Sequence, residues 1–248
     1  MDSQEQAVYE SIKIVSGIVG IILLYFIITI IRYQRRSLRL NKEKIQAEID
    51  TLENERKRIA SDLHDELGPL LSAVKLQINS LETVSEDDQE VIDKSSVHID
   101  SIIGKLREIS NNLMPNTLMR KGLKKAISEF IDHSHHASGL QVKFICDEEL
   151  NLDQQQEINI YRMLQEILHN TIKHAQASYL IIKIMTEQNR LLIMTADNGK
   201  GFDYFGKLKE NSGLGLRNLQ SRVEVMGAEI SCQSELGKGT MYTVEIPI

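Results

Sequence analysis

A histidine followed directly by an aspartate, His64-Asp65, lies in a segment whose apolar residues recur at helical spacing. The apolar stripe consists of Leu63, Leu67, Leu70, Val74, Ile78 and Leu81. His64 is one position off this stripe, which predicts a place at the water-facing rim of a helical bundle. An imidazole that donates one ring N–H to a carboxylate has its other nitrogen free to attack phosphorus. For a lone His-Asp pair, a surface histidine beside an acid is the ordinary alternative.

Four short motifs follow in order in the second half of the chain. They are Glu166-x-x-x-Asn170-x-x-Lys173-His174, Asp197-Asn198-Gly199-Lys200-Gly201, Gly213-Leu214-Gly215-Leu216 and Gly237-Lys238-Gly239-Thr240. Each motif alone is weak, because Asp-Asn-Gly and Gly-Lys-Gly-Thr are also common turn sequences. Because the four motifs occur in this order after the His64 segment, they are better interpreted as parts of one functional site than as unrelated turns.

Together the four motifs resemble the N, G1 and G2 boxes and the closing Gly-x-Gly-Thr of the GHKL ATP-binding fold. Gyrase, the heat-shock chaperone, histidine kinases and MutL share this fold. With the His64 segment included, residues 50–248 resemble a sensor histidine kinase. The His-Asp pair and the lead-in Arg56-Lys57-Arg58-Ile59-Ala60 are similar to the nitrate-sensor-type subfamily. The resemblance implies an α+β fold in which a dimeric helical hairpin precedes a GHKL α/β sandwich.

The resemblance also implies the roles of the site residues. His64 would accept the γ-phosphoryl group of ATP, and Asp65 would orient the imidazole and take its proton. Asn170 would bind Mg²⁺, with Glu166 as a further ligand or a residue that orients water. The resemblance implies that Lys173 and His174 contact phosphate, and that Gly213 and Gly215 lie in a lid over about 202–215. The implied adenine contacts are Asp197 with the exocyclic amine, and Gly199, Gly201 and Thr240 beside the base.

The amino-terminal part contains an uncharged run from Ile14 to Ile31, which is long enough to cross a bilayer. A signal peptide and a buried core helix are the alternatives, but acidic residues precede the run and bulky residues close it. The basic residues that follow the run are Arg32, Arg35, Arg36, Arg39, Lys42 and Lys44. By the positive-inside rule we expect a single-pass protein of the cytoplasmic membrane, with residues 1–13 outside and the kinase in the cytoplasm.

Residues 32–54 form a basic juxtamembrane segment that continues as a charged, apolar-striped helix. Leu38, Ile45, Leu52 and Ile59 are spaced by sevens, and Ile49 and Leu63 fill the alternate positions. A solvated charged helix is the alternative. We expect a short parallel coiled coil between two subunits, because the segment runs without Pro or Gly into the His64 helix.

Residues 55–115 are expected to form the dimerisation and phosphotransfer hairpin. Its second helix should span about Asp88–Leu113, with Ser85-Glu86-Asp87-Asp88 as its polar start. Two helices must dimerise to bury both stripes, which predicts a four-helix bundle. His98 is interpreted as a surface residue on this helix. His133, His135 and His136 have no metal-ligand spacing and are interpreted as a solvated helix end.

Residues 116–248 show a mixed helix and strand pattern, expected to be an antiparallel-leaning sheet with helices on one face. The predicted strands are 141–146, 179–187, 190–197, 229–235 and 241–246, and the predicted helices are 153–175 and about 216–226. The polar stripe Asn159, Arg162, Glu166, Asn170 and Lys173 is expected on the first of these helices, its outer members on a solvated face. Cys146 and Cys232 lie in strands and are interpreted as buried, reduced thiols.

The sequence therefore predicts a membrane-anchored, homodimeric sensor histidine kinase that uses ATP and Mg²⁺ and passes the phosphoryl group to the receiver domain of a response regulator. A GHKL ATPase without a phosphohistidine and a non-catalytic membrane scaffold are the alternatives. The net charge of −6 argues against nucleic acid as a direct partner.

One departure from the subfamily concerns phosphatase activity. Relatives that dephosphorylate their regulator resemble one another in a Gln five residues after the histidine, or in the wider family a Thr or Asn four residues after it. Gly68 and Pro69 stand there, and neither carries a side-chain hydrogen-bonding group. We expect weak or no phosphatase activity and a helix that bends one turn beyond His64. A tolerated kink, with Glu66 or the regulator itself positioning the water, is the alternative.

Overall fold

The computed structural model describes residues 3–81, 85–114, 116–147, 150–209 and 214–248. The chain divides into two compact units, Met1–Glu48 and Ile49–Ile248. The first unit consists of the larger part of helix α1 (Ser3–Asp62). It contains the one stretch among the described residues that is apolar and long enough, by length and composition, to cross a bilayer. The apolar run predicted at 14–31 therefore lies within a helix.

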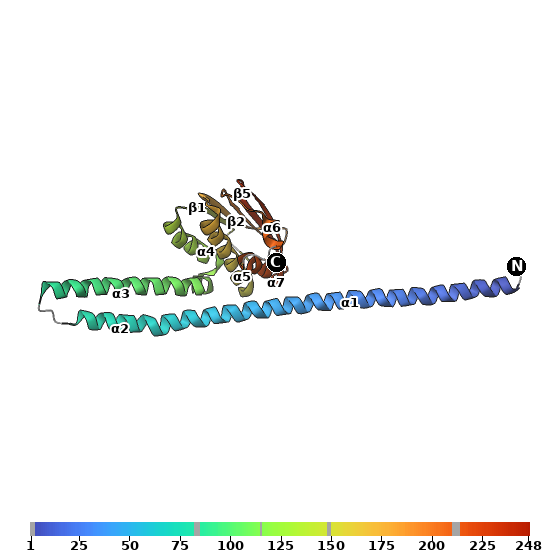
Figure 1. Ribbon diagram of the computed structural model, residues 1–248, viewed down its shortest axis with the longest axis horizontal. Helices are drawn as coiled ribbons and strands as arrows, with labels where there is room; N and C mark the ends of the chain where they lie inside the picture. Colours follow the sequence, from blue (N-terminus) through green and yellow to red (C-terminus); the bar gives the residue numbers. More distant parts are fainter. Residues whose placement is uncertain (1–2, 82–84, 115, 148–149, 210–213) are drawn as a thin grey trace. The chain divides into compact units, whose positions relative to one another are not determined.

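The second unit begins with a helical hairpin. Its first arm is the end of α1, the π-helical turn η1 (Leu63–Leu67) and α2 (Gly68–Asn79), and its second arm is α3 (Glu86–Leu113). The Ser85 side chain caps α3 by accepting a hydrogen bond from the backbone N–H of Asp88, as the polar start predicted. Figure 1 shows α2 and α3 side by side, and Lys75 on α2 forms an ion pair with Asp100 on α3.

Apolar side chains of the hairpin remain exposed in the single chain. They include Leu67, Leu70, Leu76, Val97, Ile102 and Ile109. A hairpin that buries so little of its own apolar surface is suited to packing against another one. The four-helix bundle stays a prediction, because the structure contains one chain.

The helix is irregular just before Pro69, where a π-helical turn includes His64. Pro69 has no N–H, so the carbonyl of Asp65 lacks the donor that an α-helix would supply four residues later. A π turn accommodates this missing donor, and Gly68 keeps helical angles of φ −60° and ψ −55°. The phosphoacceptor candidate thus lies on irregular helical backbone.

The sheet has five strands in the order β1-β2-β3-β5-β4. The strands are β1 (Gln141–Cys146), β2 (Tyr179–Glu187), β3 (Arg190–Asp197), β4 (Glu229–Glu235) and β5 (Gly239–Pro247). β1 pairs in parallel with β2, and all other neighbours are antiparallel. The predicted turn at Gln188-Asn189 is confirmed, since both residues have positive φ angles of 45° and 67°.

Helices cover one face of this sheet (Figure 1). They are α4 (Asn116–Ser138), α5 (Gln154–Asn170) with the π-helical turn η2 (Thr171–Ala175), α6 (Tyr204–Lys209) and α7 (Leu214–Val225). Asp153 and Gln156 form a capping box that starts α5. The core between helices and sheet is built from apolar side chains of α4, α5, α7 and the strands, among them Leu123, Ile160, Met163, Ile184 and Ile193. The α+β prediction is confirmed.

Three expectations need correction. Helix α4 was not predicted, apart from a helix end near His133. Cys146 and Cys232 are half-buried rather than buried. Asn159 and Arg162 were expected on a solvated helix face, yet only 1% and 6% of their surfaces are exposed. The reason is that hydrogen-bonding partners on other helices cover them, as described below. His98 is exposed, as predicted.

Candidate active site

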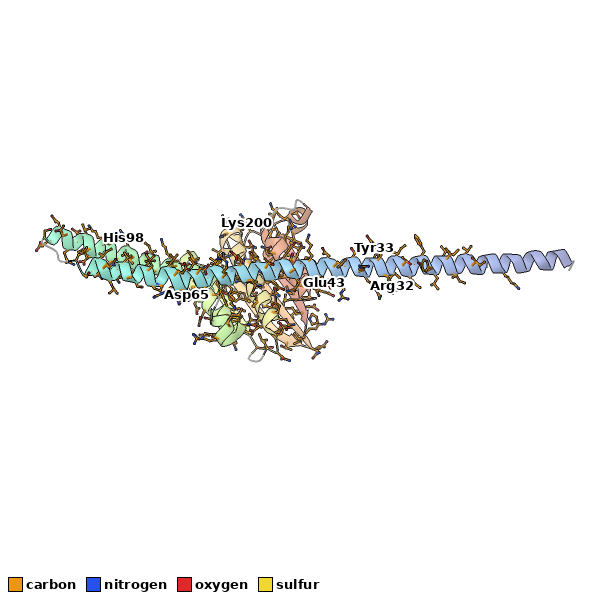
Figure 2. All side chains as sticks on the ribbon, turned by 90° about the horizontal axis from the view of Figure 1, so that it is seen from below. Arg32, Tyr33, Glu43, Asp65, His98 and Lys200 are labelled. Carbon is orange, nitrogen blue, oxygen red and sulfur yellow. The ribbon has the colours of Figure 1, made fainter. Side chains whose placement is uncertain are left out.

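His64 is exposed on η1 and borders a cavity of the hairpin. The cavity is lined by residues of η1, α2 and α3, among them Pro69, Leu106 and Ser110. Figure 2 labels Asp65, which follows His64 on the first arm of the hairpin, and His98 on the second arm. A bound nucleotide can reach an exposed imidazole on a helix, whereas it cannot reach a buried structural histidine.

Asp65 is also exposed, and its carboxylate accepts a hydrogen bond of 2.9 Å from the Ser61 hydroxyl one turn earlier. In the described part of the chain this carboxylate is bonded to Ser61 and not to the His64 ring. Neighbouring residues on a helix point in different directions, so a rotation of either side chain is needed before they meet. The role of Asp65 as orienter and proton acceptor stays a prediction.

Glu166 and Asn170 come together one turn apart on α5. The Asn170 amide nitrogen donates to Glu166 Oε1 at 3.1 Å, and this leaves the amide oxygen available to another ligand. Gly215 of α7 lies against this pair, since a Cβ on Gly215 would be 2.0 Å from Glu166 Oε1. Three residues from two predicted motifs are therefore close in space.

Lys173 and His174 lie on η2, one turn beyond Asn170, and both side chains are exposed. The predicted helix 153–175 thus ends in a π-helical turn that carries the two cations. Gly213 lies outside the described residues, as do residues 210–212 of the expected lid.

Asp197 ends β3 and is the Cα partner of Thr240 on β5, so the predicted adenine residues meet across one pair of strands. Asp197 Oδ1 accepts a hydrogen bond of 2.8 Å from the backbone N–H of Gly199. Thr240 is buried, and its hydroxyl lies 3.0 Å from that of Ser234. Burial raises the pKa of the Asp197 carboxyl, and hydrogen bonds from the Gly199 and Thr240 backbone partly offset this.

The glycines beside Asp197 fit against protein backbone. A Cβ on Gly199 would lie 2.4 Å from the carbonyl oxygen of Ala175, at the end of η2. A Cβ on Gly201, whose φ is +60°, would lie 2.0 Å from the carbonyl oxygen of Glu235. Close packing of the loop against η2 and β4 therefore requires both glycines, whatever contact they also make with a nucleotide.

Sequence reasoning missed a polar network on the other side of α5. Glu53 of α1 forms ion pairs with Arg162 of α5 at 3.0 Å and with Arg222 of α7 at 2.6 Å. Arg222 also donates to the amide oxygen of Asn159 at 2.9 Å. Burial alone would raise the pKa of Glu53, but the two guanidinium groups outweigh this and hold the pKa below its ordinary value.

Two family models match the chain in the order of its folded parts. Residues 55–118 match the model described as "Histidine kinase", and residues 155–248 match that described as "Histidine kinase-, DNA gyrase B-, and HSP90-like ATPase". The chain thus joins histidine kinase helices to a GHKL-type ATP-binding sheet. It belongs to the histidine kinases, in the nitrate-sensor-type subfamily.

Two relatives resemble most of this chain. The oxygen sensor histidine kinase NreB of Staphylococcus carnosus (strain TM300) is 30% identical over 220 residues, which cover 87% of this chain and 62% of NreB. The sensor histidine kinase ComP of Bacillus subtilis (strain 168) is 28% identical over 205 residues, which cover 79% of this chain and 27% of ComP. The chain therefore spans less than two thirds of the length of either relative.

A solved structure, the histidine kinase domain from Erythrobacter litoralis EL346 blue-light activated histidine kinase, is 18% identical with a TM-score of 0.48. The match covers 74% of this chain and 95% of that one.

Proposed function

We propose that the protein is a membrane-anchored, homodimeric sensor histidine kinase that phosphorylates His64 from Mg-ATP and passes the phosphoryl group to an aspartate of a response regulator. The observation that carries the proposal is that one chain holds an exposed histidine on a helical hairpin and an ATP-binding fold in which Asp197 meets Thr240 and Glu166 meets Asn170. The domain limits that we propose are 55–115 for the phosphotransfer part and 116–248 for the ATP-binding part.

In the proposed reaction a ring nitrogen of His64 attacks the γ-phosphorus of ATP. The new N–P bond forms as the bond from phosphorus to the β,γ-bridging oxygen breaks, and ADP leaves with the electron pair. The proton on the other ring nitrogen of His64 passes to the Asp65 carboxylate after the Asp65 side chain turns away from Ser61. Asp197 accepts a hydrogen bond from the adenine amine, which favours ATP over GTP because guanine carries a carbonyl at that position.

The residues around Asn170 fit a magnesium ion. Mg²⁺ prefers oxygen ligands and keeps several of its waters, so one amide oxygen with a nearby carboxylate is sufficient. The Asn170 amide oxygen would be a direct ligand, and Glu166 would hold a bound water. When bound, the ion supplies positive charge that neutralises the phosphates. Lys173, His174, Gly213 and Gly215 would contact phosphate oxygens.

Membrane anchoring rests on the apolar part of α1 and on the basic residues directly after it. Two exposed apolar arms per chain support a homodimer, because a second hairpin would bury them.

Incubation of the chain with γ-labelled ATP and Mg²⁺ tests the proposal. We expect an acid-labile, base-stable label on the wild-type chain and none on His64→Gln. His98→Gln is the matched control, because His98 is an exposed histidine on the other arm of the same hairpin. ATP hydrolysis without label would favour a GHKL ATPase, and neither label nor hydrolysis would favour a scaffold.

A further inference from the structure

The carboxylate of Glu53 is held between two arginines that come from distant parts of the sequence, and Arg56, one turn later on α1, also lies 3.5 Å from its Oε1. Arg162 Nε and Nη2 both donate to Glu53 Oε2 at 3.0 Å, and Arg222 Nη2 donates to Glu53 Oε1 at 2.6 Å. Glu53 belongs to α1, whereas the arginines belong to helices α5 and α7 of the ATP-binding part. The pairing therefore fastens the ATP-binding part to α1.

All three charged side chains are removed from water. Only 5% of the Arg162 side chain, 6% of the Arg222 side chain and 16% of the Glu53 side chain are exposed. Arg162 also donates to the carbonyl oxygens of Asn112 and Leu113 at the end of α3, and Arg222 also donates to the amide oxygen of Asn159. One buried network thus joins both arms of the hairpin to α5 and α7.

A buried ion pair of this kind is a poor means of adding stability. Removing charges from water costs about as much as their attraction returns, so apolar residues of similar volume often stabilise as well or better. The pair is, however, directional, since a planar guanidinium fork binds a carboxylate in one geometry. Such a network is suited to specifying one arrangement of two parts.

This arrangement does not bring the ATP-binding part to His64. Glu53 and His64 are 11 positions apart on one helical arm, which corresponds to about 16 Å along its axis. The cavity beside His64 is lined only by hairpin residues. A separate cavity, beside Arg162 and Arg222, is also lined by Glu166 of the proposed ATP site. For phosphoryl transfer, reacting atoms must approach to about 3–3.5 Å. To phosphorylate His64 of its own chain, the ATP-binding part must therefore move along the hairpin.

We propose that Glu53, Arg162 and Arg222 form a latch that holds the ATP-binding part in a non-phosphorylating position, and that a rotation or shift of α1 opens it. This inference rests on the proposed kinase function. Glu53 lies on the helix that also contains the candidate membrane span, so a motion of that helix changes the position of the carboxylate directly. A displacement of a few ångströms separates the Glu53 carboxylate from both guanidinium groups. The contact can therefore act as a two-state element, either formed or broken.

The test compares Glu53→Gln with Glu55→Gln in the full-length chain in lipid nanodiscs. Glu53→Gln keeps the shape and removes the charge. Glu55 is the matched control, because it lies two residues away on the same helix and forms a surface pair with Arg58. We would measure the initial rate of phosphohistidine formation at saturating ATP. In parallel, we would measure amide hydrogen exchange in peptides that contain Glu53 and the end of α3.

We expect Glu53→Gln to form phosphohistidine at least about fivefold faster than the wild-type chain, a typical size for coupling between sites. We also expect faster exchange in both peptides, and no change in either measurement for Glu55→Gln. An unchanged rate overturns the latch, and so does a slower rate with faster exchange, because the contact would then position the domain productively. If Glu53→Gln does not fold, Glu53→Asp decides by the same criteria, since its shorter carboxylate cannot reach both guanidinium groups.

The two proposals fail in different ways. Absence of phosphohistidine in the wild-type chain and in every variant refutes the kinase function. In that case the exchange measurement still decides whether Glu53 fastens the ATP-binding part to α1, and unchanged exchange in Glu53→Gln overturns the latch independently.

Discussion

Replacing Gly199 with alanine should destabilise the ATP-binding part, although the substitution adds only one methyl group. The new Cβ would lie 2.4 Å from the carbonyl oxygen of Ala175 and 2.7 Å from its Cβ. The Ala175 carbonyl oxygen cannot rotate out of the way, because it belongs to the backbone and accepts a hydrogen bond of 2.8 Å from the N–H of Lys200. The loop after β3 must therefore separate from the end of η2.

The size of the effect follows from the required displacement. Ordinary contact begins at 3.4 Å, so the carbonyl must retreat by about 1 Å. Overpacking of this kind costs about 1–3 kcal/mol. For a chain of this size the Tm should fall by roughly 2–12 °C. The shift also disturbs the hydrogen bond from Gly199 to Asp197, and we expect adenine nucleotides to bind about tenfold more weakly, equivalent to about 1.4 kcal/mol.

Thermal unfolding and titration with a fluorescent adenine nucleotide measure the two effects. Gly104→Ala on α3 is the control, since a Cβ there meets no atom within 4 Å and alanine favours a helix by about 0.5–1 kcal/mol. A wild-type Tm and wild-type nucleotide affinity for Gly199→Ala would show that the close approach to Ala175 is not required.

Four further predictions concern the nucleotide site, the dimer and the regulator. Asn170→Ala and Asp197→Ala should both lower autophosphorylation, Asn170→Ala by about 10–100-fold, but only Asp197→Ala should weaken binding of a metal-free adenine nucleotide. Equal weakening would refute these roles. Because burial raises the pKa of Asp197, wild-type binding should decline, as pH falls, at a higher pH than an ordinary aspartate would give. A fragment starting near Gln46 should sediment as an active dimer, and a monomer at micromolar concentration would contradict the bundle. With ADP and Mg²⁺, the fragment from Gln46 onward should scarcely accelerate loss of aspartyl phosphate from its regulator, because neither Gly68 nor Pro69 has a side-chain hydrogen-bonding group to position water. Many-fold acceleration without phosphohistidine would refute this reading.

Local patterns predicted most of the sheet and the helical hairpin. The alternation in 179–187 and 190–197, with Gln188-Asn189 between, gave the bounds of β2 and β3, because a two-residue turn fixes the register of a hairpin. The start of α3 was also predictable, since Ser85 caps it through a local hydrogen bond. Features of this kind are encoded within a few residues.

The position of α4 was missed although its signal is present. Leu123, Ala126, Ile127, Phe130 and Ile131 have the helical spacing of a buried face. The pattern begins abruptly, because Gly122 interrupts the helix with φ 77° and ψ 176°. Reading the segment after this glycine as a separate helix would have found the element.

The Glu53 network could not be predicted from local patterns. Its members are separated by 109 and 169 residues, and charged residues at helical spacing usually indicate a solvated face. Only the folded arrangement shows that Arg162 and Arg222 converge on one carboxylate. The fit of Gly199 against Ala175 was likewise hidden, since the sequence indicates a glycine but not which backbone approaches it.

The most direct test of the kinase function is to locate the phosphoryl group in the full-length chain after incubation with Mg-ATP. Tandem mass spectrometry at neutral pH, with a fragmentation method that preserves N–P bonds, identifies the modified residue. We expect phosphate on the His64 peptide in the wild-type chain and far less in Asp197→Ala, which removes the proposed adenine contact. Phosphate on another residue such as His98, or an unmodified chain under conditions that saturate nucleotide binding, would contradict the assignment of His64 as phosphoacceptor.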